Sequence, residues 1–238
     1  MKIGGFQRFS LLDYPGQLAA IVFTQGCNFR CPYCHNPALV NPDRFEPVLD
    51  TEWVLRFLYR RRKKLGAVVI SGGEPTLQED LIPFLKLLKA MRYKVKLDTN
   101  GSQPELLEEV CRYKLVDYFA MDIKAPLQLY KLITRSDIEV HSITQSMDSI
   151  RRAAVPYEFR TTYFDALLGQ QDLLTMQDLL KPGDRYILQE CRYGQNLEMI
   201  DKPFAPEPGM VPLADSEVCQ SLIGWGKEHS VSISIRSL

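Results

Sequence analysis

The sequence predicts an α/β fold in which a parallel sheet curves into a partial, TIM-like (β/α)6 barrel. Short apolar runs with strand character alternate with helical patterns along most of the chain, as in folds with helices outside a parallel sheet. Six such strand–helix units suit an incomplete barrel, since a closed eight-fold barrel typically needs about 250 residues. Unusual polar residues follow the ends of successive predicted strands, where such barrels carry their functional sites.

The elements follow from apolar spacing. A continuous apolar run such as LAAIVFT indicates a buried strand, and apolar residues three or four apart indicate a helix. Strands are predicted over 18–24, 67–71, 94–99, 117–123, 157–163, 185–189 and 231–235, and helices over 51–64, 80–91, 104–113, 143–153, 172–180 and 215–229. We expect one domain over 1–238, with a short N-terminal extension at 1–17 and a proline-rich surface loop at 195–212.

Composition and charge narrow the class of protein. The 238 residues are 45% hydrophobic and 24% charged, as in an ordinary globular domain. Lys plus Arg and Asp plus Glu are each 29, so no global basic field attracts nucleic acid. No apolar run approaches the ~20 residues of a membrane helix, and no signal peptide is visible, so we expect no membrane partner and a cytoplasmic location. Disulfides are rare there, so the six cysteines are interpreted as thiols or metal ligands.

Three of these cysteines, Cys27, Cys31 and Cys34, follow the first predicted strand with the spacing C-x3-C-x2-C. Three thiolates on one loop suit a [4Fe–4S] cluster whose fourth iron is open to a ligand. The alternative is structural zinc, which takes four ligands and commonly two separated C-x2-C pairs. The chain offers no second pair, and His35 beside Cys34 is an awkward fourth ligand. The spacing therefore favours the open cluster and leaves zinc as the alternative.

The residues around this loop resemble the radical S-adenosylmethionine (SAM) superfamily. Tyr33 provides an aromatic residue before the last cysteine, and Gly72-Gly73-Glu74-Pro75 follows the second predicted strand. The resemblance implies that the open iron chelates SAM, and that reduction of the cluster cleaves SAM to methionine and a 5′-deoxyadenosyl radical. It also implies that the GGEP backbone and the Glu74 side chain receive the SAM amino group, with no catalytic residue apart from the cluster and SAM. Tyr33, Cys34 and His35 belong to the implied SAM site, where His35 and Asn36 either orient the loop or cap the next turn.

Two further segments resemble the glycyl-radical-enzyme activases within that superfamily. They are Asp98-Thr99-Asn100-Gly101 and Asp122-Ile123-Lys124, at the ends of the third and fourth predicted strands. The resemblance implies that Asp122 and Lys124 hold ribose hydroxyls and a carboxylate of SAM. It also implies a monovalent-cation site near Asp98, Thr99 and Asp122. The alternatives to these roles are that Lys124 is a solvated surface lysine and that residues 98–99 only cap the turn after the strand.

Arg160 lies in the middle of the fifth predicted strand, where an unpaired buried charge is costly. The resemblance suggests that it meets the SAM carboxylate, and the alternative is an ion pair with Asp122 or Glu158. Many family members carry a histidine at the end of the sixth strand that stacks on adenine. Here Gln189 stands near that place, which leaves the adenine contact open. The remaining cysteines, Cys111, Cys191 and Cys219, have no ligand spacing; we expect Cys111 and Cys219 to be buried apolar residues.

The N-terminal stretch closely resembles the anaerobic ribonucleoside-triphosphate reductase activating proteins, on the side of that group near the pyruvate formate-lyase activases. The likeness is carried by GFQRFSLLDYPG at 5–16 and FTQGC at 23–27. It implies removal of a hydrogen from a glycine Cα of a partner glycyl-radical enzyme, with flavodoxin or ferredoxin as electron donor. The alternatives are a small-molecule catalyst similar to 7-carboxy-7-deazaguanine synthase and a non-catalytic scaffold that binds zinc or a cluster.

Overall fold

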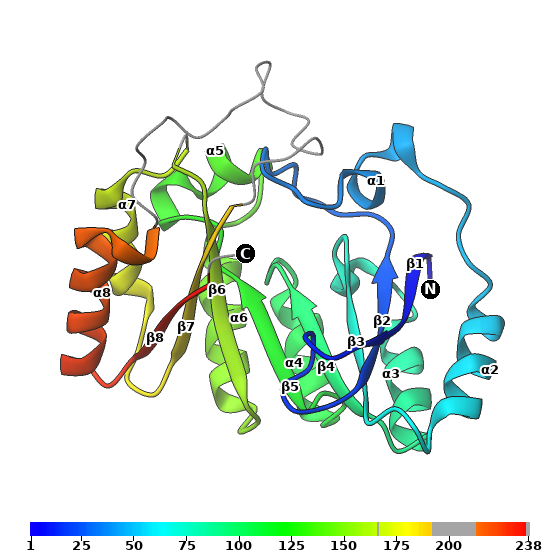
Figure 1. The fold of residues 1–238 in the computed structure, drawn as a ribbon. Coiled ribbons are helices and arrows are strands. Elements are labelled where there is room, and N and C mark those ends of the chain that lie inside the picture. Colours follow the sequence, from blue (N-terminus) through cyan, green and yellow to red (C-terminus); the bar gives the residue numbers. More distant parts are fainter. Residues whose placement is uncertain (166, 192–212, 237–238) are drawn as a thin grey trace.

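A computed structural model of the protein describes residues 1–165, 167–191 and 213–236, and Figure 1 shows its fold. One eight-stranded sheet has the order β1-β2-β3-β4-β5-β6-β7-β8. β1 is antiparallel to β2, and each later strand is parallel to the strand before it. The strands are β1 Ile3–Ser10, β2 Ala19–Thr24, β3 Ala67–Gly72, β4 Lys94–Thr99, β5 Tyr118–Asp122, β6 Tyr157–Tyr163, β7 Arg185–Glu190 and β8 Ser232–Arg236.

Helices follow the strands and cover the outside of the curved sheet (Figure 1). They are α1 Pro37–Val40, α2 Thr51–Arg61, α3 Leu81–Ala90, α4 Pro104–Arg112, α5 Tyr130–Thr134, α6 His141–Arg152, α7 Gln170–Thr175 and α8 Glu217–Glu228. Six strand–helix units run from β2 to α8, with β8 after them, which confirms the expected partial (β/α)6 barrel. The short helices α1 and α5 lie at the end of the barrel where the parallel strands finish (Figure 1).

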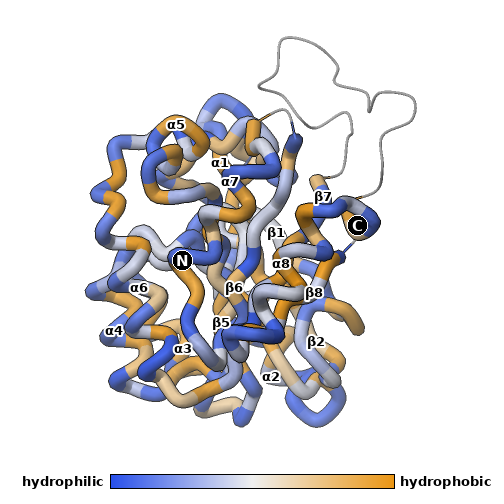
Figure 2. The backbone as a smooth tube through the Cα atoms, turned by 90° about the vertical axis from the view of Figure 1, so that its left-hand side faces the viewer, coloured by the Kyte–Doolittle hydropathy of each residue, from blue (hydrophilic) through white to orange (hydrophobic). Residues whose placement is uncertain are grey.

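The two faces of the strands divide the core. Val22, Ile70 and Leu97 belong to the large apolar cluster that packs against the helices, whereas Ile21 and Val69, one residue earlier on β2 and β3, belong to a small cluster on the other face. The parallel strands read as apolar runs because both of their faces are buried. In Figure 2, α3, α4 and α6 show hydrophobic and hydrophilic residues in alternation, as expected of helices with one face on the core.

The segment between β1 and β2 closes the barrel at the end where the parallel strands begin. Tyr14 joins the small interior cluster, with its ring centroid 6.0 Å from that of Tyr118 on β5. The Lys96 ammonium on β4 donates a hydrogen bond to the Asp13 carbonyl oxygen at 2.8 Å. The Asp13 carboxylate accepts a hydrogen bond from Ser10. This end is therefore plugged, and the interior cavity described below lies at the opposite end.

Most of the predicted elements are confirmed, β4 and β6 with the expected bounds. The N-terminal extension at 1–17 contains the strand β1, which the sequence does not predict because an edge strand pairs on one side only and buries few of its residues. Helix α5 is also unpredicted, and the helix expected over 172–180 is α7 followed by a 3-10 turn, Met176–Leu179. The proline-rich loop at 195–212 lies outside the described residues. No helix in the described ranges combines the length and apolarity needed to span a bilayer.

Candidate functional site

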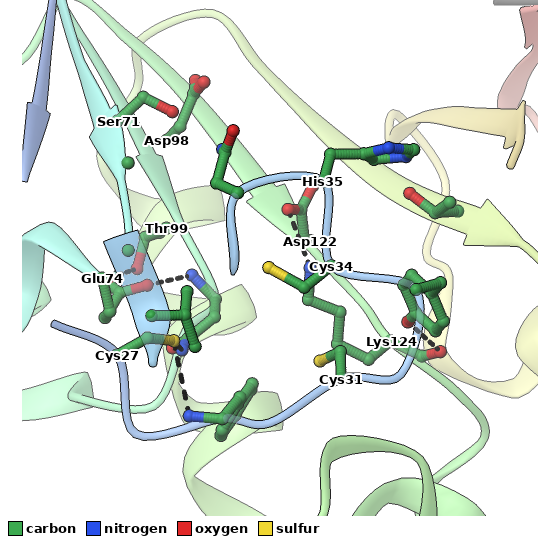
Figure 3. Close-up of a pocket in the computed structure, with 18 of the residues that line it drawn as sticks. Cys27, Cys31, Cys34, His35, Ser71, Glu74, Asp98, Thr99, Asp122 and Lys124 are labelled. Carbon is green, nitrogen blue, oxygen red and sulfur yellow. Dashed lines mark hydrogen bonds and ion pairs between the residues drawn. The ribbon is translucent and has the colours of Figure 1, made fainter. Parts of the chain in front are cut away.

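A cavity at the end of the barrel where the parallel strands finish is lined by every residue that the sequence analysis places in the SAM site or the cluster site (Figure 3). These residues are Cys27, Cys31, Tyr33, Cys34, His35, Gly72, Gly73, Glu74, Asp98, Asp122, Lys124 and Arg160. They come from the segment after β2 and from the carboxyl ends of β3, β4, β5 and β6. Parallel strands bring their carboxyl ends to one edge of the sheet, so residues far apart in sequence meet there.

The cysteine loop after β2 is held by its own main chain and by α5. The Arg30 guanidinium donates hydrogen bonds to the Cys27 and Phe29 carbonyl oxygens at 2.6 and 2.9 Å. The Arg30 main-chain N–H donates to the Thr134 carbonyl oxygen at 2.7 Å, which fastens the loop to the end of α5. The sulfur atoms of the three cysteines face a common space in Figure 3. A four-iron cluster takes its three thiolates on three different irons, so this donor set fits such a group.

Burial affects two thiols of this loop. Burial, with a contribution from the Glu74 carboxylate, raises the pKa of the Cys27 thiol to about 12. Burial also raises the pKa of the Cys31 thiol to about 11. Iron must therefore displace their protons, as metal binding to cysteine generally does. Within the described part of the chain, no group of three His, Cys, Asp or Glu side chains is placed to hold a single metal ion.

Tyr33 links the cysteine loop to the end of β5. Its side chain is buried, and its hydroxyl donates to the Lys124 carbonyl oxygen at 3.4 Å. The Lys124 N–H in turn donates to the Tyr130 hydroxyl oxygen on α5 at 3.2 Å. The aromatic residue before the last cysteine therefore positions the D-x-K segment against the cysteine loop.

The two glycines of Gly72-Gly73-Glu74 let the loop after β3 lie directly on the start of the cysteine loop. A Cβ on Gly73 would lie 2.0 Å from the Gly26 carbonyl oxygen. Gly72 has φ +116°, and a Cβ there would lie 2.3 Å from the Thr24 nitrogen. The resulting close approach allows the Glu74 N–H to donate to the Gly26 carbonyl oxygen at 2.8 Å. Only glycine permits this backbone contact.

The Glu74 carboxylate joins the loop after β3 to the loop after β4. One oxygen accepts hydrogen bonds from the Thr76 N–H at 3.0 Å, the Thr76 hydroxyl at 2.6 Å and the Thr99 hydroxyl at 2.8 Å, and the other accepts from the Asn100 N–H at 2.6 Å. Burial raises the pKa of Glu74, and these hydrogen bonds oppose that shift. Each carboxylate oxygen offers about two acceptor positions, so Oε1 is fully used, whereas Oε2 accepts one of these hydrogen bonds. These contacts hold the Glu74 side chain beside the cysteine loop, and the expectation that it and the GGEP backbone receive the SAM amino group stays a prediction.

Charged side chains alternate across the cavity from β5 to β6 and β4. The Asp122 carboxylate lies 3.0 Å from the Lys124 ammonium and 2.8 Å from Arg160 Nε. Arg160 Nη1 lies 3.7 Å from Asp98 Oδ2. Burial raises the pKa of Asp122, but the two adjacent cations more than offset burial and hold it below its usual value. The ion pair between Arg160 and Asp122 that the sequence left as an alternative is present, whereas Glu158 instead accepts from the Tyr118 hydroxyl at 2.9 Å.

Gln189 and the three cysteines outside the loop differ in their relation to the cavity. Gln189 lines the cavity, and its Nε2 donates to the Thr162 hydroxyl oxygen at 2.8 Å, so its amide is oriented at the place expected for an adenine contact. Cys111, Cys191 and Cys219 do not line this cavity. Cys219 is buried as expected, whereas Cys111 is half-buried, with its Sγ 3.8 Å from the Ser149 carbonyl oxygen.

Asn100 and Lys96 are the residues that the sequence analysis missed. Asn100 Nδ2 lies 3.8 Å from Cys27 Sγ and donates to Asn28 Oδ1 at 3.0 Å, which couples the loop after β4 to the cysteine loop. Its position inside the D-T-N-G segment was the available signal. Lys96 is buried on β4, two residues before Asp98 and on the same face, and period-2 alternation was the available signal there.

The chain belongs to the Radical SAM superfamily, whose defining pattern matches residues 21–180. It is 35% identical over 194 residues to a Methanocaldococcus jannaschii protein that by its name belongs to the glycyl-radical enzyme activating enzymes, covering 79% of each chain. It is 36% identical over 127 residues to the pyruvate formate-lyase-activating enzyme of Clostridium pasteurianum, covering 52% of each chain. A 7-carboxy-7-deazaguanine synthase of Clostridium acetobutylicum is 26% identical over 184 residues, covering 70% of this chain and 80% of that protein.

Solved structures give the same fold. QueE from Escherichia coli superposes with a TM-score of 0.59 at 16% identity, covering 99% of this chain and 93% of that one. Streptococcus suis SuiB bound to S-adenosylmethionine superposes with a TM-score of 0.66 at 14% identity, covering 91% of this chain. The chain spans about half the length of SuiB, 51%. The protein is thus a radical SAM enzyme, a family that works with a [4Fe–4S] cluster and SAM, and it is similar to glycyl-radical enzyme activating enzymes.

The close approach of Gly73 to the Gly26 backbone predicts that a larger residue at position 73 destabilises the fold. We expect Gly73→Ala to lower the free energy of unfolding by about 1–3 kcal/mol, as overpacking does, because the new Cβ meets the Gly26 backbone rather than a flexible side chain. Gly224→Ala is the matched control, since Gly224 is exposed in α8 and a Cβ there meets nothing within 4 Å. That change should raise stability by roughly 0.5–1 kcal/mol, the usual gain in a helix interior. Urea denaturation measures both; equal stability of Gly73→Ala and the unchanged protein would contradict the contact.

Proposed function

We propose that this protein activates a partner glycyl-radical enzyme by removing a hydrogen atom from the Cα of one glycine of that partner. The observation that carries the proposal is the gathering of the cysteine loop, the GGEP loop and the D-x-K segment around one cavity. The relative that matches 79% of each chain is named for activating glycyl-radical enzymes, and a second relative is named for activating pyruvate formate-lyase.

Different residues of the cavity would bind the cluster and SAM. Cys27, Cys31 and Cys34 would hold a [4Fe–4S] cluster with one iron left for SAM. The reduced cluster, when bound, supplies the electron that cleaves SAM to methionine and a 5′-deoxyadenosyl radical. The GGEP backbone, with Gly72 and Gly73, and the Glu74 side chain would receive the SAM amino group. Tyr33 and His35 would shape the cavity beside the cluster.

The charged side chains would orient the rest of SAM. Asp122 accepts hydrogen bonds and suits ribose hydroxyls, while Lys124 and Arg160 are cationic donors that suit the carboxylate. Both cations are already held by Asp122, at 3.0 and 2.8 Å, so their positions are set before a ligand arrives. Such prior positioning would help to hold bound SAM in one orientation.

The proposed reaction balances as a hydrogen-atom transfer. The glycine Cα–H bond breaks, the hydrogen forms a new C–H bond at the 5′ carbon of 5′-deoxyadenosine, and the unpaired electron stays on the glycine. One external electron is consumed for each SAM cleaved. We propose flavodoxin or ferredoxin as its donor and the cytoplasm as the place of action, since the loop thiols must stay reduced.

A second candidate function is catalysis on a small molecule. It is favoured by the similarity to 7-carboxy-7-deazaguanine synthase over 70% of this chain. The activase proposal ranks above it because identity is 35% rather than 26% over a comparable length. The third experiment below separates the two candidates.

The first test concerns the cluster. Protein reconstituted without oxygen should bind about four irons per chain, and Cys27→Ala, Cys31→Ala or Cys34→Ala should lose them, because each removes a thiolate ligand. Iron and sulfide analysis with the visible absorption spectrum measures this. Cys111→Ala is the control, since Cys111 does not line the cavity, and it should keep the full content. A protein that binds one zinc and no iron would refute the cluster.

The second test concerns SAM. With dithionite, the protein should convert SAM to 5′-deoxyadenosine and methionine. Lys124→Ala should weaken SAM binding by about tenfold or more, the worth of one charge-assisted hydrogen bond, while leaving the iron content unchanged. Equilibrium dialysis and chromatography measure binding and products. Lys131→Ala, on the exposed side of α5, is the control and should bind SAM as tightly as the unchanged protein. Tight binding by Lys124→Ala would remove Lys124 from the site.

The third test concerns the substrate. The reduced protein, SAM and a glycyl-radical enzyme encoded in the same genome should together give the doublet electron paramagnetic resonance signal of a glycyl radical. Replacing the partner's radical-site glycine by alanine should abolish the signal, because the transferred hydrogen is then absent. If 5′-deoxyadenosine forms while no such partner gains a radical, the small-molecule candidate takes the place of the activase.

A further inference from the structure

The charged row extends beyond Arg160 to Lys96, a residue that does not line the cavity and has no role in the proposed function. Lys96 Nζ lies 3.3 Å from Asp98 Oδ1, and Arg160 Nη1 lies 3.7 Å from Asp98 Oδ2. The row therefore runs Lys96, Asp98, Arg160, Asp122, Lys124, with signs that alternate at each step. Three cations face two carboxylates, so the row by itself has one positive charge in excess; the Glu74 carboxylate, which also lines the cavity, is hydrogen-bonded to Thr76, Thr99 and Asn100.

This excess disagrees with the monovalent-cation site that the resemblance implies at Asp98, Thr99 and Asp122. The Asp122 oxygens are paired with Arg160 and Lys124, and the Thr99 hydroxyl donates to Glu74 and accepts from the Gly101 N–H at 3.1 Å. Asp98 lies between two protein cations. A bound metal cation would place a further positive charge against Lys96 and Arg160, where repulsion is screened little by water.

Lys96 is held in place independently of any ligand. Its side chain is only 7% exposed. Its ammonium donates to the Asp13 carbonyl oxygen at 2.8 Å and lies 5.8 Å from the centre of the Tyr118 ring. These contacts come from the segment between β1 and β2, which fills the other end of the barrel, and from β5. They fix the ammonium beside Asp98.

One acceptor in the row is incompletely satisfied. Asp98 Oδ1 is buried and has no hydrogen-bond donor among the described residues, because its contact with Lys96 is an ion pair without hydrogen-bond geometry. A neutral donor, such as a hydroxyl group of a bound nucleoside, would complete it without adding charge. A metal cation at this oxygen would instead add a positive charge beside Lys96 and Arg160.

We propose that the Lys96 ammonium is the built-in counter-charge of Asp98 and takes the place of a monovalent metal cation in this enzyme. Lys96 is thus a positioning residue: it holds the Asp98 carboxylate, and through Asp98 and Arg160 it aligns the groups that meet SAM. The proposal rests on the proposed binding of SAM in this cavity, and it implies that SAM binding needs neither Na⁺ nor K⁺.

The experiment measures SAM affinity of the cluster-loaded protein by equilibrium dialysis in choline chloride, NaCl or KCl, each at about 0.1 M so that screening is constant. The unchanged protein should bind SAM equally, within about twofold, in all three salts. Lys96→Ala removes the charge and opens space beside Asp98, so its affinity should fall about tenfold in choline chloride and return in NaCl or KCl. Lys96→Arg keeps the charge and should stay insensitive to the salt.

Two further variants separate charge from packing. Lys96→Met keeps most of the side-chain volume without the charge, so it should bind SAM weakly in every salt. A packing role would give the reverse pattern, with recovery by methionine and none by salt. Lys94→Ala, at the exposed start of the same strand, is the control and should behave as the unchanged protein.

A readout without SAM keeps this proposal separate from the proposed function. Sodium-23 NMR relaxation should show no bound Na⁺ on the unchanged protein and bound Na⁺ on Lys96→Ala. Bound Na⁺ on the unchanged protein, SAM affinity that rises about tenfold with NaCl or KCl, or a Lys96→Ala variant that ignores the salt would each overturn the proposal. Failure to bind SAM in any salt would instead count against the proposed function, and the NMR result would still decide the cation question.

Discussion

The pairing of Arg160 with two carboxylates is the interaction on which the polar half of the barrel depends. Arg160 puts a permanent positive charge inside a ring of largely apolar strands, where an unpaired charge is strongly unfavourable. Asp122 on β5 and Asp98 on β4 neutralise it from two neighbouring strands, and Lys124 and Lys96 follow at the two ends of the row. The row positions these five charged groups before a ligand binds, while Glu74, which also lines the cavity, is held by Thr76, Thr99 and Asn100.

The cysteine loop is held in position mainly by hydrogen bonds that involve the main chain. The loop after β3 lies directly on Gly26, and the buried Glu74 carboxylate binds the loop after β4 to it. Tyr33 and Arg30 then fasten the loop to β5 and α5. Three loops from different strands thus form one rigid support, and a cluster and SAM held by this support would meet at a constant distance, as hydrogen transfer requires.

The two ends of the barrel have different tasks. The segment with Asp13 and Tyr14 fills the end where the parallel strands begin, whereas the cavity occupies the end where they finish. Lys96 connects the ends, because the same ammonium contacts the plug and the carboxylate beside the SAM site. Lys96 thus links the two ends, although neither it nor Asp13 lines the cavity.

The sequence by itself determined the class of enzyme and most of the residues that line the cavity. C-x3-C-x2-C, GGEP, D-T-N-G and D-x-K are short local patterns, and cofactor recognition by loop backbone and adjacent side chains needs only a few consecutive residues. The strand–helix alternation was equally local, so the order of β2 to β8 could be predicted, while the edge strand β1 could not because its burial is one-sided.

Only the tertiary structure decided which charges pair. Lys96 donates a hydrogen bond to Asp13, 83 positions away, and Glu74 accepts one from Asn100, 26 positions away. No spacing rule predicts such partners. Glu74 is thereby tied to the loop after β4, and Asp98 lies between Lys96 and Arg160. Electrostatic neutralisation in a buried site depends on which side chains the strands bring together, and that is fixed by sheet register rather than by neighbours in the chain.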